Sequence, residues 1–287
     1  MKILYTSDIH ASKDHLMSML ALAEKEVVDT LIIGGDLIPH RLFQTHLRDI
    51  LLAQKEYLEK VFLPAIRTFR KKNDIHIYLD LANDDFVGIR TLLEEENGKQ
   101  FYLLHMEKYP LTDAVDIIGY MMVPPTPFGK KDWEKPDSKH LPYSKGNRIT
   151  LNGYVSSSGQ LKEIVLDLET DDTIEADLSK LSKKIDKSFI FIAHCPPYNT
   201  PLDMLFNGTH VGSLSIRKFI EKWSESGHLI ASFHGHIHES PNISGSIRSI
   251  ISNCPCINPG QNTGEGAVFR SVMFEIVNGQ KPRVNFL

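Results

Sequence analysis

Short apolar runs that end in metal-binding side chains constrain the fold of this chain more than any other feature. They alternate with longer stretches whose apolar residues recur at three- and four-residue spacing, as in amphipathic helices. The predicted strands are Lys2–Thr6, Thr30–Ile33, Ile75–Leu79, Asp116–Val123, Phe189–Ala193, Leu229–Phe233 and Val268–Val277. The predicted helices are Lys13–Val28, Arg41–Lys72, Phe86–Glu96, Asp171–Ile185 and Gly212–Ser226. This alternation is typical of an α/β layered fold in which helices cover both faces of the central strands.

The composition excludes several classes of protein. Apolar residues make up 41% and charged residues 24%, so disordered and fibrous architectures are excluded. The net charge of -4, from 32 basic and 36 acidic residues, gives no sign of a general nucleic-acid or membrane-surface binder. No apolar run approaches the roughly 18 residues of a membrane span, and the first is too short for a signal peptide. We therefore expect a cytoplasmic protein.

Polar side chains follow several predicted strands at the point where each strand ends. In chain order these segments are Asp8-Ile9-His10, Gly34-Gly35-Asp36, Asn83-Asp84-Asp85, His194 and His234-Gly235-His236-Ile237-His238. Each is weak alone, because a D-x-H pair is common by chance and a lone histidine after a strand is more often a packed core residue. Ligands of open α/β sheets bind beyond the carboxyl ends of the strands. The joint occurrence of these segments therefore favours one metal or phosphate site.

The spacing within these segments suits a metal centre. Two pairs of side chains are two residues apart, so each pair projects to one side of an extended segment. The pairs are Asp8 with His10, and His236 with His238. Such pairs could hold two metal ions from opposite directions, with Asp36 supplying a carboxylate able to bridge them. Gly34 and Gly35 permit an unusual backbone turn before Asp36. The 13 histidines, against 3 cysteines, make imidazole and carboxylate the expected ligands.

The order of these segments resembles the calcineurin-like metallophosphoesterase superfamily over roughly residues 1–260. The family pattern appears as Asp8-Ile9-His10, Gly35-Asp36, Ala82-Asn83-Asp84-Asp85, His194 and Gly235-His236-Ile237-His238, followed by Ile257-Asn258-Pro259-Gly260. Further stretches resemble a prokaryotic branch of uncharacterised phosphoesterases. They are Lys131-Asp132-Trp133-Glu134, Pro196-Pro197-Tyr198 and Gly208-Thr209-His210-Val211-Gly212-Ser213.

The resemblance implies a fold and a ligand set. The fold would be a four-layer α/β/β/α sandwich of the metallophosphoesterase type. One divalent ion would be held by Asp8, His10 and His238, a second by Asn83, His194 and His236, and Asp36 would bridge both. Mn, Fe, Zn or Ni would suit these donors. Because ligands from position 8 to position 238 must meet, we expect residues 1–287 to form a single domain, with a surface excursion at about 124–160.

Two departures from the family pattern bear on the chemistry. Asp36 is followed by Leu37-Ile38 rather than Arg-Gly, which argues against a phosphoprotein phosphatase. Asp84 stands where the family's G-N-H histidine would be, a residue implied to stabilise the phosphorane or to protonate the leaving group. A carboxylate beside dications stays ionised and is a poor general acid.

The mechanism implied by the resemblance is metal-assisted hydrolysis, in which two ions share a hydroxide that attacks phosphorus in line. Asn83 would ligate a metal and orient the phosphate, with Asp84 as the catalytic candidate beside it. His210 is the candidate leaving-group acid, although a loop histidine with a structural hydrogen bond fits equally well, and His40 is a weaker candidate. Without an acid, substrates need good leaving groups, which favours phosphodiesters.

Substrate selection is expected to involve Pro124–Gly159 and Pro196–Leu205. Tyr198 or Trp133 is a candidate to stack on a nucleobase, although packing aromatics are commoner. Lys130-Lys131 could attract an anionic substrate, although exposed lysines usually form only a solvated face.

Two other classes of function stay open. A non-catalytic scaffold of the same fold, like retromer's calcineurin-like subunit, is expected to have lost metal ligands that are present here. The replacement of the family histidine by Asp84 still leaves the scaffold hypothesis open. A nuclease is the second alternative, but no basic groove interleaved with aromatic residues appears in the sequence. The expected partner is a small phosphate ester, with no membrane and no long nucleic acid, and homo-oligomerisation is left open.

Overall fold

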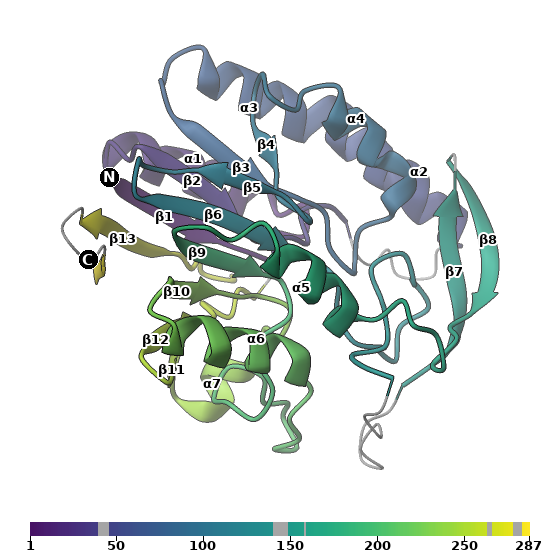
Figure 1. Ribbon diagram of the computed structural model, residues 1–287. Coiled ribbons are helices and arrows are strands. Elements are labelled where there is room, and N and C mark those ends of the chain that lie inside the picture. Colours follow the sequence, from purple (N-terminus) through teal and green to yellow (C-terminus); the bar gives the residue numbers. More distant parts are fainter. Residues whose placement is uncertain (40–45, 140–148, 158, 263–265, 278–282) are drawn as a thin grey trace.

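Two six-stranded sheets lie face to face at the centre of the molecule, and helices cover their outer faces (Figure 1). This computed structural model describes residues 1–39, 46–139, 149–157, 159–262, 266–277 and 283–287. The predicted four-layer α/β/β/α sandwich is confirmed. None of the helices in the described part of the chain is long and apolar enough to cross a membrane.

The first sheet contains the strands that begin the chain. In spatial order its strands are β14 (Arg283–Phe286), β13 (Val272–Val277), β1 (Lys2–Thr6), β2 (Thr30–Ile33), β3 (His76–Leu79) and β4 (Tyr102–Leu103). Strands β1 to β4 are parallel, and β13 and β14 extend the sheet with antiparallel pairing. Parallel strands covered on both faces are expected to be apolar throughout, and β2 is buried over its whole length.

The second sheet is built in the same way from later strands. Its order is β11 (Arg248–Ile251), β12 (Cys254–Ile257), β10 (Leu229–Phe233), β9 (Ser188–Ala193), β6 (Val115–Tyr120) and β5 (Lys108–Pro110). The four inner strands are parallel, and β5 and β11 close the two edges with antiparallel pairing. The carboxyl ends of the inner strands therefore lie at one edge of this sheet, as they do in the first.

Aromatic rings join the two sheets through the core. Tyr5 of β1 and Phe233 of β10 have ring centroids 5.0 Å apart, and Phe233 stacks on Phe274 of β13 at 4.5 Å. All three side chains are buried. Because large aromatic rings bury much apolar area, these contacts fix how the sheets face each other.

The helices fall within the predicted periodic stretches, except for the short helix Ser240–Ser244, which was not predicted. They are α1 (Lys13–Lys25), α2 (Leu47–Tyr57), a π-helical turn (Leu58–Phe62), α3 (Leu63–Arg70), a 3₁₀ turn (Val87–Ile89), α4 (Arg90–Glu94), α5 (Ile174–Ser182), α6 (Leu214–Glu225) and α7 (Ser240–Ser244). Ser12 and Ser213 cap α1 and α6 by accepting backbone N–H bonds. The prediction for α1 ran too far, because the left-handed backbone of Val27 (φ 50°) lies beyond the end of the helix. His40 lies outside the described residues.

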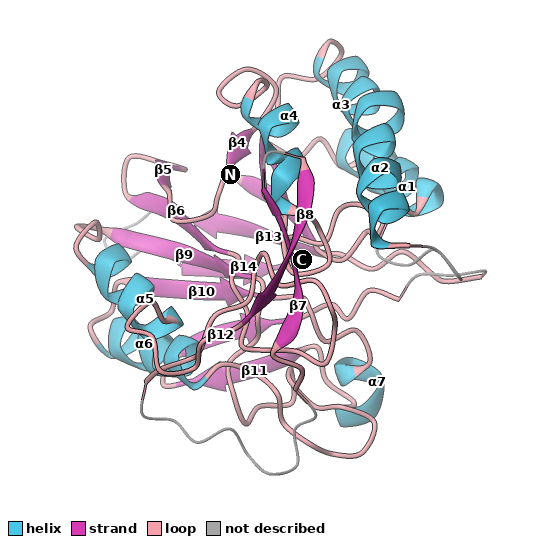
Figure 2. Cartoon of the chain, turned by 90° about the vertical axis from the view of Figure 1, so that its right-hand side faces the viewer, coloured by secondary structure: helices cyan, strands magenta, loops and turns pink. Residues whose placement is uncertain are grey.

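The predicted surface excursion at about 124–160 is only partly correct. Its last part forms β7 (Asn152–Ser157), which pairs with β8 (Gln160–Val165) in an antiparallel hairpin. The hairpin stands apart from both large sheets at the right of Figure 1 and crosses in front of them in the view of Figure 2. The residues of β7 include few apolar side chains, so no strand period was visible in the sequence. Residues 140–148 and 158 of the excursion lie outside the described part of the chain.

Residues 130–134 of the excursion are largely buried rather than solvated, although Phe128 just before them is 41% exposed. Lys130 is 5% exposed and Lys131 is 2% exposed, so the prediction of a solvated lysine face is wrong. Trp133 is 3% exposed and packs edge-on against His105, which leaves no ring face for a nucleobase. The stacking prediction for Trp133 is therefore also wrong. Both errors have one cause, since the backbone here folds inward along β7 instead of crossing the surface.

Candidate metal centre

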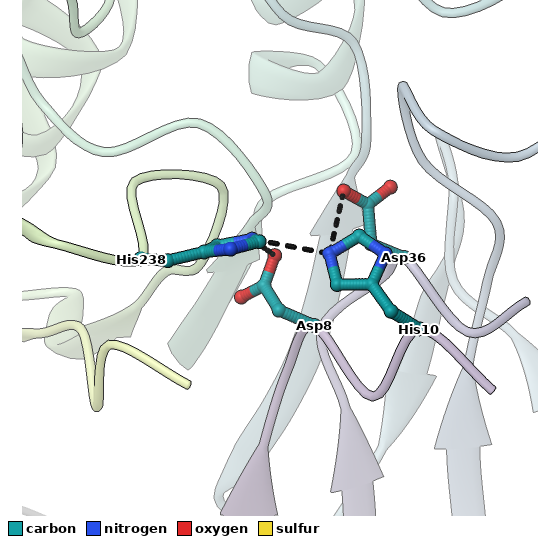
Figure 3. Close-up of side chains that lie close together, drawn as sticks. All are labelled: Asp8, His10, Asp36 and His238. Atoms are coloured by element: carbon teal, nitrogen blue, oxygen red, sulfur yellow. Dashed lines mark hydrogen bonds and ion pairs between the residues drawn. The ribbon is translucent and has the colours of Figure 1, made fainter. Parts of the chain in front are cut away.

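A buried group of carboxylates and imidazoles lies at the carboxyl ends of β1, β2 and β10. Asp8, His10, Asp36 and His238 each offer a ligand atom, and these atoms all lie within 4.8 Å of one another (Figure 3). His10 Nε2 is 3.1 Å from His238 Nε2, and His238 Nε2 is 3.2 Å from Asp8 Oδ1. Such a set of nitrogen and oxygen donors could hold a divalent transition-metal ion.

A second group lies next to the first, around His194 at the end of β9. His194 Nε2 is 3.0 Å from Asn83 Oδ1 and 3.3 Å from Asp36 Oδ2. On the other side of the ring, Nδ1 lies 2.8 Å from the carbonyl oxygen of Gly34. A carbonyl can only accept, so Nδ1 carries a proton, and Nε2 is the ring nitrogen that faces the other donor atoms and could bind a metal ion.

His236 completes this second group from the loop after β10. Its ring centroid is 5.4 Å from that of His194, and its backbone N–H donates to Asp8 Oδ1 at 3.0 Å. The same loop therefore contributes His238 to the first group and His236 to the second.

Asp36 lies between the two groups. Its Oδ2 atom is 3.8 Å from His10 Nε2 and 3.3 Å from His194 Nε2. Its Oδ1 atom accepts the backbone N–H of Asp84 at 3.0 Å. The structure thus gathers Asp8, His10, Asp36 and His238 in one group, with Asn83, His194 and His236 beside them. Their roles as metal ligands, and that of Asp36 as a bridge, stay predictions.

The backbone at these positions is unusual for residues with a side chain. Asp8, His10, Asp36 and His236 have φ values of 58°, 46°, 50° and 66°, in the left-handed region. Such conformations cost about 1–3 kcal/mol and persist only where the surroundings hold them. The turn expected before Asp36 is present, since Gly35 has φ 108° and a Cβ there would lie 2.7 Å from His194 Nδ1.

Two buried residues, whose role the sequence pattern did not reveal, hold the ligand loops in place. Asp85 accepts the N–H groups of Leu37, Ile38 and Ala82 at 3.0–3.1 Å, which ties the loop after β2 to the loop after β3. Gln54 of α2 donates to the carbonyls of Pro39 and Asp84 and accepts from Phe86 N–H. Asp85 could have been found from its place in the third motif, whereas Gln54 had only its position on the apolar face of a helix.

The charges of the two groups act strongly on one another. Burial opposes ionisation of Asp36, but His194 and His10 hold its pKa below the usual range. Burial also opposes the charge of His194, yet Asp36 and Asp8 raise its pKa to about 9. For His236 burial wins and lowers the pKa to about 4. Two carboxylates in so dry a place attract positive charge, which is the electrostatic condition that a cation site requires.

His210 and Tyr198 lie in the loop between β9 and α6. His210 Nδ1 is 2.7 Å from Asp203 Oδ1, and the ring of Tyr198 stands edge-on to His210 at 6.2 Å. Asp203 is buried and also accepts N–H groups of its own loop. These contacts agree with the structural reading of His210, and its role as an acid stays a prediction, as does substrate binding by Tyr198, whose side chain is 37% exposed.

A four-layer sandwich with carboxylates and imidazoles gathered at its strand ends has the donor set that a metal-dependent protein needs. The chain belongs to the calcineurin-like phosphoesterases, because the model of that family matches residues 1–240. The expected superfamily and its class of enzyme are confirmed.

Solved structures share the fold. A dimetal phosphatase from Danio rerio is 10% identical, with a TM-score of 0.54 over 99% of this chain and 98% of that one. The protein TT1561 of Thermus thermophilus is 14% identical, with a TM-score of 0.52 over 90% of this chain and 88% of that one. At such identities the likeness concerns the fold alone.

One curated relative is similar in sequence over a shorter stretch. The uncharacterized protein MJ1162 of Methanocaldococcus jannaschii is 40% identical over 86 residues. The match covers 29% of this chain and 38% of that protein, so it spans well under half of the relative's length.

Proposed function

We propose that this chain hydrolyses small phosphate esters with the help of two divalent cations, and that phosphodiesters are better substrates than alkyl monoesters. The observation that carries the proposal is the position of Asp36 between two groups of donors, 3.8 Å from His10 and 3.3 Å from His194. The dimetal phosphatase from Danio rerio, which has the same fold, supports a pair of ions in such a site.

The donor set fits these cations. Asp8 Oδ2 is buried and has no hydrogen-bond partner among the described residues, so this oxygen needs a positively charged neighbour. One ion would be held by Asp8, His10, Asp36 and His238, and the other by Asp36, Asn83, His194 and His236. Two bound cations would supply Lewis acidity and a water that is nucleophilic at neutral pH. Imidazole with carboxylate suits Mn, Fe, Zn or Ni.

The side chains around the cations would position the ester. Asn83 is 4% exposed, and its amide nitrogen can donate to a phosphate oxygen while its Oδ1 faces His194. Asp85 and Gln54 hold the loops after β2 and β3 in a fixed position relative to each other. The ligands on these loops would therefore already be oriented before the substrate binds.

The preference for diesters follows from residue 84. Asp84 Oδ1 is 3.0 Å from the ammonium of Lys130, and an ionised carboxylate accepts hydrogen bonds without donating a proton. The Asp84 carboxylate would therefore give no proton to the alkoxide leaving group of an alkyl monoester. We expect nitrophenyl diesters to be hydrolysed well and glycerol phosphate slowly.

Metal analysis of the purified protein, combined with assays on a monoester and a diester of nitrophenol, tests the proposal. We expect bound metal and manganese-supported hydrolysis, and a loss of about 10³-fold or more in kcat/KM for Asp36→Asn and His194→Ala, because each removes several kcal/mol of charge stabilisation. Absence of bound metal, together with no activity when manganese is added, would refute the proposed hydrolase activity. Metal binding without any hydrolysis would favour the scaffold, and faster cleavage of long DNA or RNA than of small esters would favour the nuclease.

Two finer parts of the proposal have their own tests. Rapid turnover of glycerol phosphate would contradict the diester preference. We also propose that residues 1–287 act as one unit, since the two donor groups draw on residues 8 to 238, and a single cooperative unfolding transition is the expected result.

A further inference from the structure

Lys130 is a buried cation placed directly on residue 84, beside the metal centre. Its ammonium is 3.0 Å from Asp84 Oδ1 and also donates to the carbonyl oxygen of Asp84. The two side chains are only 6% and 16% exposed. Asp84 follows Asn83, and its own N–H donates to Asp36 Oδ1 at 3.0 Å. Two hydrogen bonds and the backbone of Asp84 join the ammonium of Lys130 to the carboxylate of Asp36. The two groups therefore lie within about 10 Å of each other.

The segment that presents Lys130 is held rigidly. We call residues 129–134 the lysine segment. Lys131 N–H donates to the Tyr154 carbonyl at 2.8 Å, and Tyr154 N–H donates to the Gly129 carbonyl at 2.8 Å, which binds the segment to β7. Asp132 Oδ2 accepts Val87 N–H at 3.0 Å, close after the loop that contains Asp84. Contacts on both sides of Lys130 thus fix where its side chain begins.

The charge of Lys130 bears on any anion that binds at the metal centre. A phosphate ester brings negative charge to the site, and hydrolysis moves more of that charge onto the leaving oxygen. In a partly desolvated site, an ammonium within about 10 Å contributes about 10-fold to the affinity for a unit negative charge, and the Asp84 carboxylate offsets part of this contribution in the parent protein. Asp84 holds the ammonium through its carbonyl oxygen as well as its carboxylate, so part of this placement survives without the carboxylate charge.

We propose that Lys130 is a phosphate-recognition residue of this site, and that Asp84 is a positioning residue that holds the ammonium toward the bound phosphate ester. The proposal rests on the proposed phosphoesterase function. It differs from a purely structural role, in which Lys130 only neutralises the buried carboxylate of Asp84.

A set of matched variants separates the two roles. The probe is inorganic phosphate, whose dissociation constant is measured by calorimetry on the metal-loaded protein and whose inhibition constant is measured against a nitrophenyl diester. The variants are Lys130→Met, Lys130→Arg, Asp84→Asn and the double variant Asp84→Asn/Lys130→Met. Lys139→Met is the control, because Lys139 lies in the same part of the chain but forms an exposed ion pair with Asp171. Metal content and thermal unfolding are recorded for each protein.

The expected results follow from the charge at position 130. Lys130→Met should weaken phosphate binding about 10-fold with metal content unchanged, while Lys130→Arg and Lys139→Met should stay within about 3-fold of the parent. Asp84→Asn should bind phosphate at least as well as the parent, because its carboxylate no longer offsets the charge of the ammonium. The double variant should bind phosphate about 10-fold more weakly than Asp84→Asn, the same factor by which Lys130→Met is weaker than the parent.

Equal phosphate affinity in Asp84→Asn and in the double variant would overturn the proposal, because it would mean that Lys130 serves only to neutralise Asp84. Unchanged affinity in Lys130→Met would overturn it as well. Calorimetry reads phosphate binding even if no ester is hydrolysed, so failure of the proposed enzyme and failure of the Lys130 proposal give different results. If Lys130→Met does not fold, the comparison of Asp84→Asn with the double variant decides the question.

Discussion

Two regions of this molecule bury charged side chains, and they compensate those charges in different ways. In the lysine segment each cation has an acidic partner, since Lys131 lies 2.7 Å from Glu134 and Lys130 lies 3.0 Å from Asp84. In the metal centre, Asp8 and Asp36 face imidazoles, and Asp8 Oδ2 has no partner among the described residues.

The difference shows how a site that binds a cation can be told from buried charge that stabilises structure. A buried charge is tolerated only when it is paired, hydrogen-bonded or bound to a metal. The lysine segment satisfies this condition with its own residues. The metal centre satisfies this condition only in part, because Asp8 Oδ2 has no hydrogen-bond partner among the described residues. A bound metal ion would compensate the charge of this oxygen.

Breaking the pairing in the lysine segment should have the largest effect on stability. Glu134→Gln removes the carboxylate from Lys131, whose side chain is buried, and should lower the free energy of unfolding by about 2–4 kcal/mol, because the burial that raises the pKa of Glu134 to about 7 offsets part of the gain from the ion pair. Denaturant titration measures this. The double variant Glu134→Gln/Lys131→Met should recover most of the loss, and a double variant as unstable as Glu134→Gln would show that the ion pair is not the cause.

Crowding the metal centre should mainly affect metal binding. A Cβ at Gly235 would lie 2.3 Å from Asp8 Oδ2 and 2.1 Å from Ser7 Oγ, so Gly235→Ala must displace a ligand. We expect kcat/KM to fall about 10²-fold, with reduced metal content and a loss of about 1–3 kcal/mol in stability. Gly129→Ala is the matched control in the lysine segment, because a Cβ there meets nothing within 4 Å. Equal effects of the two substitutions would contradict the comparison.

The smallest effect concerns acid sensitivity next to the lysine segment. Burial lowers the pKa of His105 from 6.5 to about 4, and its Nδ1 accepts Met121 N–H at 3.0 Å. Because the pKa is depressed in the folded state, the unfolded chain takes up the proton first as the pH falls. The stabilising contribution of neutral His105 is therefore complete above pH 6.5 and is lost as the pH falls toward 4. At pH 5 the loss amounts to about 1–2 kcal/mol.

The measurement compares unfolding free energies of the parent and His105→Asn between pH 7 and pH 5. The quantity to follow is the difference in unfolding free energy between the two proteins, because the contribution of Glu134 to stability changes with pH in the opposite direction. Burial raises its pKa to about 7, so its contribution is complete below its ordinary pKa and is lost as the pH rises through 7. A pH-independent difference would show that His105 does not titrate in this range.

Much of the fold could be predicted because its central strands are buried on both faces. β1, β2 and β10 have the predicted bounds, since apolar runs of strand length between turn residues have few other solutions. The strands β4, β5, β7, β8, β11, β12 and β14 were not predicted. Each lies at or near a sheet edge, where pairing with a neighbour decides the conformation more than composition does.

The sequence by itself determined the alternation of strands and helices and the positions of the candidate ligands, from Asp8 to His238. Those side chains come directly after buried strands, and parallel strands bring their ends to one edge whatever else the chain does. Only the tertiary structure decided the partners of Lys130 and Lys131. Whether a lysine meets water or a carboxylate depends on contacts with residues distant in the chain, such as Asp84, and no local pattern encodes them.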